Sequence, residues 1–291
     1  MKLRYAVLLV VSCFAFGCSR TRQTETRPEP VAATGELSPV LNTRSAWTII
    51  SDTRQHQYRA VSSSLLELSD TAGITRDSIT AVVDFTLSMN RVPEALSYSA
   101  TVVSMSAQGG VKTGTAMSAR LPFSFGGRFS QSQLTLEPSP GQSASVLTDC
   151  SNEALSSTPV IQRAIVPMPL ALQKDMTWTD SVSTVTCSGS IPVTSVAVRR
   201  YRVVGGTIGR QAAGILLERQ DKTTSAGEGS QGQHRIRLRS DGSGTAQLIV
   251  DSQTGALVES NATHTATVVI TSSGRDQRFT QRTREKISGT P

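Results

Sequence analysis

The stretch Pro192–Ile287 alternates between polar and apolar residues so regularly that antiparallel β-strands are the regular structure it suits best. In Arg235–Arg239 the cationic side chains take every second position, so they occupy one face of a strand while Ile236 and Leu238 occupy the other. Glycine-rich or acidic segments between the alternating runs predict the hairpin turns that join them. The predicted turns are 205–206, 227–229, 241–244, 251–255 and 273–274.

Alternation also marks the first half of the chain, where 78–88 has a strongly apolar face. The segment 121–125 is apolar but contains Pro122, which predicts an edge strand or a loop. Between 150 and 174 the pattern changes, because Thr158 and Pro159 are typical of a helix start and Pro167 stops the helix. We therefore expect a mainly β protein: a large curved antiparallel sheet, half-barrel or sandwich-like, with a short helical insert near 152–166.

The first residues indicate export from the cytoplasm. Two cations, Lys2 and Arg4, precede a short apolar run that is too short to span a bilayer, which is typical of a secretory signal peptide. The run ends in Ala15-Phe16-Gly17-Cys18, which resembles the lipobox of bacterial lipoproteins and is also compatible with ordinary signal peptidase. The lipobox resemblance implies cleavage before Cys18 and lipid attachment to that residue. A soluble secreted protein with a stray cysteine is the alternative.

The segment after Cys18 is rich in Thr, Arg, Gln, Glu and Pro, with few apolar residues, which predicts a disordered tether. The expected organisation is a signal peptide at 1–17, a tether at 18–45 and a single β-rich domain at 46–291. By the sorting rule of lipoproteins, Ser19 implies the outer membrane, facing the periplasm. The first expected partner is therefore the membrane itself, through the N-terminal lipid.

Two cysteines, Cys150 and Cys187, remain in the mature chain once Cys13 is removed and Cys18 carries lipid. In an exported protein such a pair is expected to form a disulfide. A metal site would need more ligands than these two residues supply. We predict no metal and no cofactor.

The sequence shows little sign of catalysis, and we expect a protein that is not an enzyme. The run Gly227–Gly232 has the spacing of a dinucleotide-binding loop, but an alternating strand follows it where that motif requires a helix. The three histidines, His56, His234 and His264, are isolated and lack metal-ligand spacing. A hydrolase triad assembled from distant residues remains the open alternative.

Basic residues form two stripes on predicted strands. One interpretation is purely structural: the cations keep a sheet face solvated and resistant to aggregation. The functional one is a cationic patch that binds anionic lipid or glycan, in keeping with the formal net charge of +7. Nucleic acid is disfavoured because aromatic stacking residues are not interleaved with the cations on these strand faces and because the expected compartment is wrong. The candidate residues are Arg235, Arg237, Arg239, Arg278, Arg282, Arg284 and Lys286.

Four short motifs in 176–287 resemble those of a set of uncharacterised bacterial envelope lipoproteins: Trp178-Thr179-Asp180, Gly227-Glu228-Gly229, the hairpin from Asp251 to Gly255, and Arg278-Phe279-Thr280-Gln281. The order of elements is more remotely similar to the half-barrels of periplasmic lipoprotein carriers and of mycobacterial lipid-binding lipoproteins. The second resemblance implies an open sheet that holds acyl chains in its concave face.

The expected function is a lipid-anchored, non-catalytic binding or interaction module of the cell envelope. The alternative is a carrier of acyl or lipid ligands in a concave apolar cavity. Packing of the same side chains in a dry sandwich core is the competing interpretation. The residues that would line the cavity are Ile79, Val83, Phe85, Leu87, Val258, Ala262, Val268 and Ile270.

Overall fold

A computed structural model describes residues 40–42, 45–50, 52–70, 73–92, 95–109, 121–139, 147, 150, 153–188, 191–208, 213–231 and 234–290. The predicted signal peptide, Cys18 and nearly all of the predicted tether lie outside these residues. No helix in the described part of the chain is long and apolar enough to cross a membrane.

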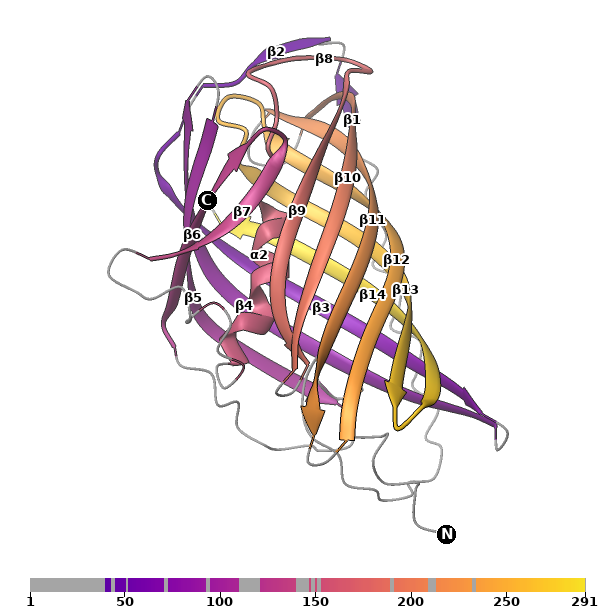
Figure 1. Ribbon diagram of the computed structural model, residues 1–291. Helices are drawn as coiled ribbons and strands as arrows, with labels where there is room; N and C mark the ends of the chain where they lie inside the picture. The colour runs from indigo at the N-terminus through magenta and orange to yellow at the C-terminus, as the bar shows by residue number, and fades with distance from the viewer. Residues whose placement is uncertain are drawn as a thin grey trace.

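Eleven strands form one closed barrel (Figure 1). All neighbouring strands are antiparallel except β7 and β9. In spatial order the strands are β10 (Ile191–Ile208), β11 (Ala213–Gln231), β12 (His234–Asp251), β13 (Leu257–Ser272), β14 (Arg275–Thr290), β3 (Gln55–Asp70), β4 (Gly73–Val92), β5 (Ala95–Gly109), β6 (Phe123–Ser130), β7 (Gln133–Pro138) and β9 (Thr177–Ser188), and β9 pairs again with β10.

The barrel closes at a narrow seam. β7 meets β9 through only two residue pairs, Gln133 with Ser181 and Leu134 with Val182. Three short strands lie outside the ring: β1 (Val40–Asn42) pairs with the last residues of β10, and β2 (Ala46–Thr48) pairs with β8 (Ala171–Gln173) near one end of the barrel (Figure 1).

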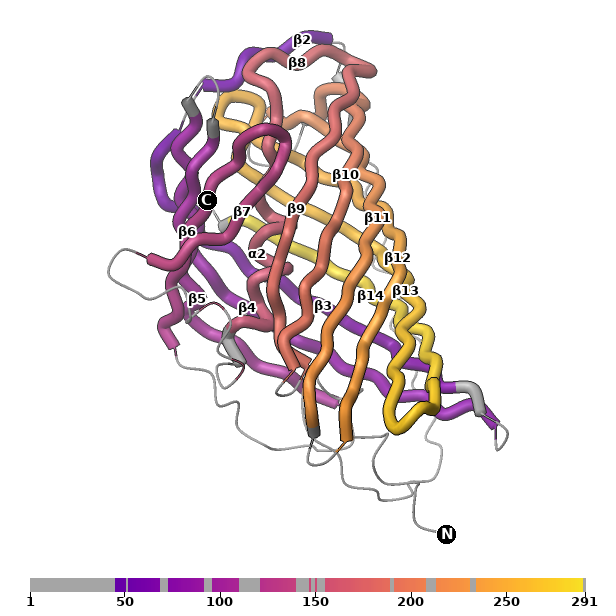
Figure 2. Tube along the Cα trace, viewed as in Figure 1, coloured from indigo at the N-terminus to yellow at the C-terminus, as the bar shows by residue number. Residues whose placement is uncertain are grey.

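The interior holds the helical segment 153–164, as the trace in Figure 2 shows. A 3₁₀ turn, η3 (Glu153–Ser157), leads into helix α2 (Thr158–Ala164), which has proline in its first turn. Leu155, Ile161, Ala164 and Ile165 are fully buried in the main hydrophobic cluster, together with apolar side chains from the inner faces of the strands. The helix is thus held inside the barrel by burial of apolar surface.

The outer face of the barrel is polar. On β13 the outward positions Asn261, Thr263, Thr265 and Thr267 are exposed, and alternate positions of β12 and β14 carry arginine, lysine, serine or threonine. Exposed large apolar residues such as Val103 and Val198 are scattered among these polar positions. The alternation seen in the sequence therefore separates a polar outside from an inside that contains the core.

The mainly β class and the short helix agree with the sequence-based expectation, but the sheet is neither a half-barrel nor a sandwich. Alternation predicts which side of a strand is buried, but it does not predict whether the two edge strands of the sheet pair with each other. In the segment 121–125, expected as an edge strand or a loop, residues 123–125 begin strand β6 (Phe123–Ser130), which lies between β5 and β7. This is possible because Pro122 precedes the strand and removes no ladder hydrogen bond.

Three of the predicted turns are also wrong. Residues 227–229 and 241–244 lie within β11 and β12, and 205–206 lie in β10 beside a register shift. Glycine is required at several of these positions because the next strand comes close: a Cβ on Gly227 would lie 2.7 Å from the carbonyl oxygen of Pro192. Turns are found at 251–255 and 273–274, as expected.

Candidate functional site: a chamber inside the barrel

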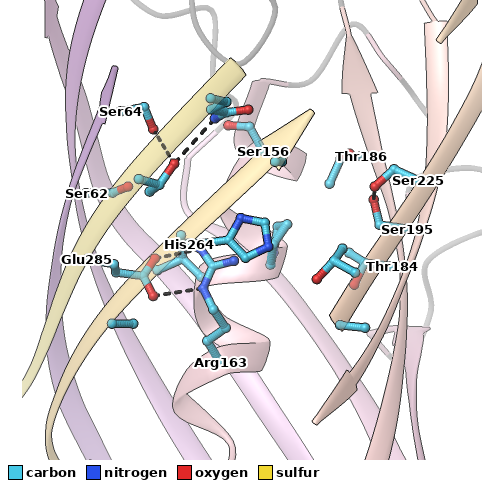
Figure 3. A pocket seen from close by; sticks show the side chains of 18 of the residues that line it. Ser62, Ser64, Ser156, Arg163, Thr184, Thr186, Ser195, Ser225, His264 and Glu285 are labelled. Atoms are coloured by element: carbon cyan, nitrogen blue, oxygen red, sulfur yellow. Dashed lines mark hydrogen bonds and ion pairs between the residues drawn. The ribbon is translucent and has the colours of Figure 1, made fainter. Parts of the chain in front are cut away.

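A cavity of about 270 Å³ lies inside the barrel between α2 and the inner faces of the surrounding strands (Figure 3). Strands β3, β4, β9, β10, β11, β12, β13 and β14 all contribute to its wall. The volume is near the lower end of the range for small-molecule sites in proteins. We call this cavity the chamber.

The helix contributes an ion pair to the chamber. Arg163 of α2 donates from Nε and Nη2 to the two carboxylate oxygens of Glu285 on β14, at 2.8 and 2.6 Å. The Glu285 side chain is 3% exposed and that of Arg163 is 34% exposed. Because Arg163 is the more accessible partner, it is the guanidinium rather than the carboxylate that the chamber presents to a ligand (Figure 3).

Two further arginines line the chamber from the strands. Arg199 of β10 donates to both oxygens of Asp180 on β9, at 2.7 Å each, and its Nη1 donates to the carbonyl of Gln162 in α2. Arg219 of β11 contacts Asp221 at 2.9 Å and donates to the carbonyl of Arg163 at 3.3 Å. The two arginines therefore hold the helix against the wall by donating hydrogen bonds to carbonyl oxygens of its backbone.

His264 of β13 lies in the same region of the chamber (Figure 3). Its ring occupies space left by two glycines of β12, since a Cβ on Gly242 would lie 2.5 Å from Cε1 and one on Gly244 would lie 3.0 Å from Cδ2. Burial lowers the pKa of His264, and the positive charge of Arg163 lowers it further. The imidazole is therefore neutral near pH 7, and its Nε2 has no hydrogen-bond partner among the described residues.

The middle of the wall is rich in hydroxyl groups, which can each donate and accept hydrogen bonds. Several are paired across neighbouring strands, such as Ser64 with Thr283 at 2.9 Å and Ser195 with Ser225 at 2.8 Å. The hydroxyl residues of the strands marked in Figure 3 are Ser62, Ser64, Thr184, Thr186, Ser195 and Ser225.

One part of the chamber wall is apolar. Val193, Leu238 and Val268 line it and belong to a second hydrophobic cluster that also contains Ile236, Ile270 and Phe279. This cluster is separate from the main core around the helix. The chamber thus has charged and hydroxyl-bearing surfaces together with an apolar patch, an arrangement suited to a compact molecule with one polar end.

The predicted basic stripes lie on the outer face, on β12 and β14, with β13 between them. Arg235 and Arg237 both contact Glu228, Arg282 contacts Glu67 at 3.3 Å, and Lys286 contacts Glu259 at 3.1 Å. Within the described part of the chain, no carboxylate lies within ion-pair distance of the remaining three. These three are Arg239, Arg278 and Arg284.

The other residues singled out from the sequence are dispersed. Cys150 and Cys187 are joined with their sulfur atoms 2.10 Å apart. His56 lies 3.3 Å from Asp52, and His234 shares a hydrogen bond with Ser273 at a hairpin end. Of the three histidines, only His264 lines the chamber.

The apolar residues proposed to hold a lipid do not form an open concave surface. Ile79, Val83, Ala262 and Val268 line the chamber, but Phe85 and Leu87 are packed in the closed core. Val258 is 37% exposed on the outside, because a register shift at Ile249/Val250 turns Leu257 inward in its place. The sequence analysis predicted none of the charged residues of the chamber.

Two charged residues of the chamber could nevertheless be recognised from their inward-facing positions in alternating strands. Arg199 has the same parity as the buried Tyr201 and Val203, and Glu285 has the same parity as the buried Ile287. A charge at an inward-facing position of an alternating strand is costly unless it is paired, so it marks a structural or functional site. Their ion-pair partners, Asp180 for Arg199 and Arg163 for Glu285, come from other elements, and alternation alone does not identify them.

No protein-family model and no curated protein matches the chain. Three solved structures of outer-membrane porins match over much of its length. OccAB4 of Acinetobacter baumannii has 8% sequence identity, covers 82% of this chain and 98% of its own, and gives a TM-score of 0.19. OpdO of Pseudomonas aeruginosa has 6% identity, with coverages of 84% and 98% and a TM-score of 0.19, and OccK8 of the same organism has 7% identity, with coverages of 84% and 99% and a TM-score of 0.18. TM-scores this low carry no argument about fold or function.

The expected membership of an envelope lipoprotein family and the likeness to half-barrel lipid carriers are wrong. The sheet closes on itself as a barrel, whereas those carriers have an open half-barrel. The expected functions, an interaction module or a carrier of acyl chains, are therefore wrong as well. A closed barrel whose inside contains three arginines and three carboxylates does not provide the open apolar face that those functions require.

Proposed function

We propose that the barrel encloses one small polar molecule in the chamber and releases it unchanged. The observation that supports this proposal is the set of polar groups inside the barrel that lack a protein partner. Nε2 of His264 and Nη2 of Arg219 are buried and have no hydrogen-bond partner among the described residues. Buried polar groups are nearly always paired, so groups left over beside a cavity indicate a ligand that pairs with them.

The absence of catalysis is part of the same proposal. Within the described residues, no serine, threonine or cysteine is hydrogen bonded to His264, which is the only histidine that lines the chamber. An activated nucleophile needs a base within hydrogen-bond reach. The carboxylates that line the chamber in the described part of the chain, Glu285 and Asp221, are in contact with arginines and so are poorly placed to act as general bases.

The polar residues of the outer face support the proposal that water, rather than lipid, surrounds the barrel. Barrels that span a membrane carry an outward apolar band about 25 Å tall. Here the outward positions of β12, β13 and β14 are arginine, lysine, threonine, serine, asparagine and glutamine along most of their length. Burying such side chains against acyl chains would be costly.

Native mass spectrometry of protein purified without detergent tests the proposal. A small molecule should accompany the wild-type chain and should be lost from Ala266→Phe, because Ala266 faces the chamber and is buried. The matched control is Thr265→Phe, which adds the same ring on the outer face of the same strand. Equal occupancy in all three proteins, or no bound molecule in any, would overturn the proposal.

We also propose a location and a surface contact, which rest mainly on the sequence. Export, lipid attachment at Cys18 and an outer-membrane position would place the barrel in the periplasm, and palmitate labelling of the wild type against Cys18→Ala tests the attachment. Arg239, Arg278 and Arg284, which have no carboxylate partner within the described part of the chain, favour contact with anionic lipid or glycan. Binding to anionic vesicles should weaken with salt and in a triple Arg→Gln variant, and binding insensitive to both would contradict the contact.

A further inference from the structure

The hydrogen-bonding capacity of the chamber is unbalanced between donors and acceptors. Both oxygens of Glu285 accept from Arg163, and both oxygens of Asp180 accept from Arg199. Asp221 is held by Arg219. Every carboxylate of the three ion pairs is thus in contact with an arginine, and among their oxygens only Oδ1 of Asp221 accepts no hydrogen bond in the described chain.

Donors, in contrast, are left over. Arg163 uses Nε and Nη2 for Glu285, so its Nη1 has no partner among the described residues. Arg219 uses Nε and Nη1, and its buried Nη2 is likewise unpaired in the described chain. Nη1 of Arg219 donates to the backbone carbonyl of Arg163, so Arg219 contacts the helix at the residue that carries the other guanidinium.

His264 lines the same chamber as both arginines, and the positive charges of Arg163 and Arg219 each lower its pKa. The neutral ring can donate or accept at Nε2, according to its tautomer. Arg163, Arg219 and His264 all line the chamber, although Nη2 of Arg219 and Nε2 of His264 themselves expose almost no surface. A planar group with two acceptor oxygens matches such donors best.

The charge of the chamber limits the ligand further. Three arginines are balanced by three carboxylates, and the histidine is neutral. A single negative charge on the ligand can gain from the spare guanidinium donors without an additional counter-ion. A multiply charged anion would be buried with too little compensation. The apolar patch formed by Val193, Leu238 and Val268 provides a place for an uncharged body.

We propose that the molecule held in the chamber is a small organic monocarboxylate, whose carboxylate binds Nη1 of Arg163 and lies beside Arg219 and His264, while a compact apolar body lies against Val193, Leu238 and Val268. This inference rests on the proposed function and specifies its ligand class. The chamber volume of about 270 Å³ suits a ring-sized body rather than a long chain.

Three probes of nearly equal shape test the inference by isothermal titration: cyclohexanecarboxylate, cyclohexanemethanol and cyclohexanemethylamine. The carboxylate should bind the wild-type protein at least about tenfold more tightly than the alcohol, since charge-assisted hydrogen bonds are roughly twice as strong as neutral ones. The amine should bind least well, because it brings donors and a positive charge to a site already rich in both.

Conservative variants test which side chains recognise the carboxylate. Arg163→Lys and Arg219→Lys keep the charge beside Glu285 and Asp221 but lose the spare planar donors. Each should weaken cyclohexanecarboxylate by about tenfold and leave cyclohexanemethanol nearly unchanged. Arg202→Lys is the control, because Arg202 is an exposed arginine on the outer face of β10 that also pairs with a carboxylate, Glu218.

The outcomes separate the two proposals. Equal or stronger binding of the alcohol or amine overturns the monocarboxylate inference while leaving a small-molecule chamber in place. The same holds if no probe binds but a molecule still accompanies the wild type and is lost from Ala266→Phe. If no probe binds and no such molecule is found, both proposals are overturned.

Discussion

Arg199 and Asp180 face each other across adjacent strands inside the barrel, joined by two hydrogen bonds of 2.7 Å, with side chains that are 2% and 0% exposed. The same guanidinium reaches Gln162 of α2, so a single residue links β9, β10 and the helix. The Trp178-Thr179-Asp180 motif gains a structural explanation, since Trp178 also stacks on Tyr201 with ring centroids 4.9 Å apart.

Asp180→Asn should strongly destabilise the protein. Removing one partner of a buried ion pair leaves the other charge uncompensated, which costs about 3–5 kcal/mol. The free energy of unfolding from urea titration measures the effect. Glu218→Gln is the matched control, because it breaks the exposed pair with Arg202 and should change stability little. Equal costs for the two variants would contradict the anchoring role of Arg199.

Gly242→Ala should push the His264 ring away from β12. The added Cβ would lie 2.5 Å from Cε1 and 2.8 Å from Nε2 of that ring. Overpacking of this kind costs about 1–3 kcal/mol. In a double-mutant cycle with His264→Ala most of the cost should disappear, because the contact is gone. The same cost in both backgrounds would show that the glycine is needed for another reason.

Stability should fall as the pH drops below about 6.5, the ordinary value for histidine. Burial, followed by the charge of Arg163, lowers the pKa of His264 in the folded protein. The unfolded chain therefore binds more protons than the folded one in this range, so acidification favours unfolding. Urea titrations at a series of pH values should show a weaker pH dependence in His264→Gln. His234→Gln, at an exposed hairpin end, should behave like wild type, and an unchanged slope in both variants would count against a buried neutral His264.

The disulfide should matter for stability because it encloses the interior helix. Cys150 and Cys187 are 37 residues apart, and the segment between them contains η3 and α2. In the chain-entropy model a loop of this length contributes about 4 kcal/mol. The double variant Cys150→Ala/Cys187→Ala should lower the urea midpoint accordingly, and reduction of the wild type should reproduce the shift. A midpoint that neither treatment changes would contradict the prediction.

Much of the strand content could be predicted from alternation, which identified the inner and outer faces of 235–239 and of 78–88 correctly. Closure could not, because it depends on the two residue pairs that join β7 to β9, and no local pattern encodes such a contact. Gly242 and Gly244 were mistaken for turn residues because glycine is common both in turns and wherever a strand must leave space for a neighbouring side chain.

The polar site could be predicted only in part. Arg199 and Glu285 occupy inward-facing positions that can be read from the sequence, whereas their partners come from β9 and α2 and are fixed by the fold. The conspicuous cations of β12 and β14 drew attention to the outer face. The arginines that line the chamber are less conspicuous because each stands among apolar or hydroxyl-bearing neighbours.

A crystal structure of the protein purified gently from its natural host, at a resolution that distinguishes a ligand from water, tests the central claim most directly. We predict connected density in the chamber that contacts Arg163, Arg219 and His264 and extends toward Leu238. A chamber filled by its own side chains, or one that contains only separate water molecules bridging those three residues, would contradict the account.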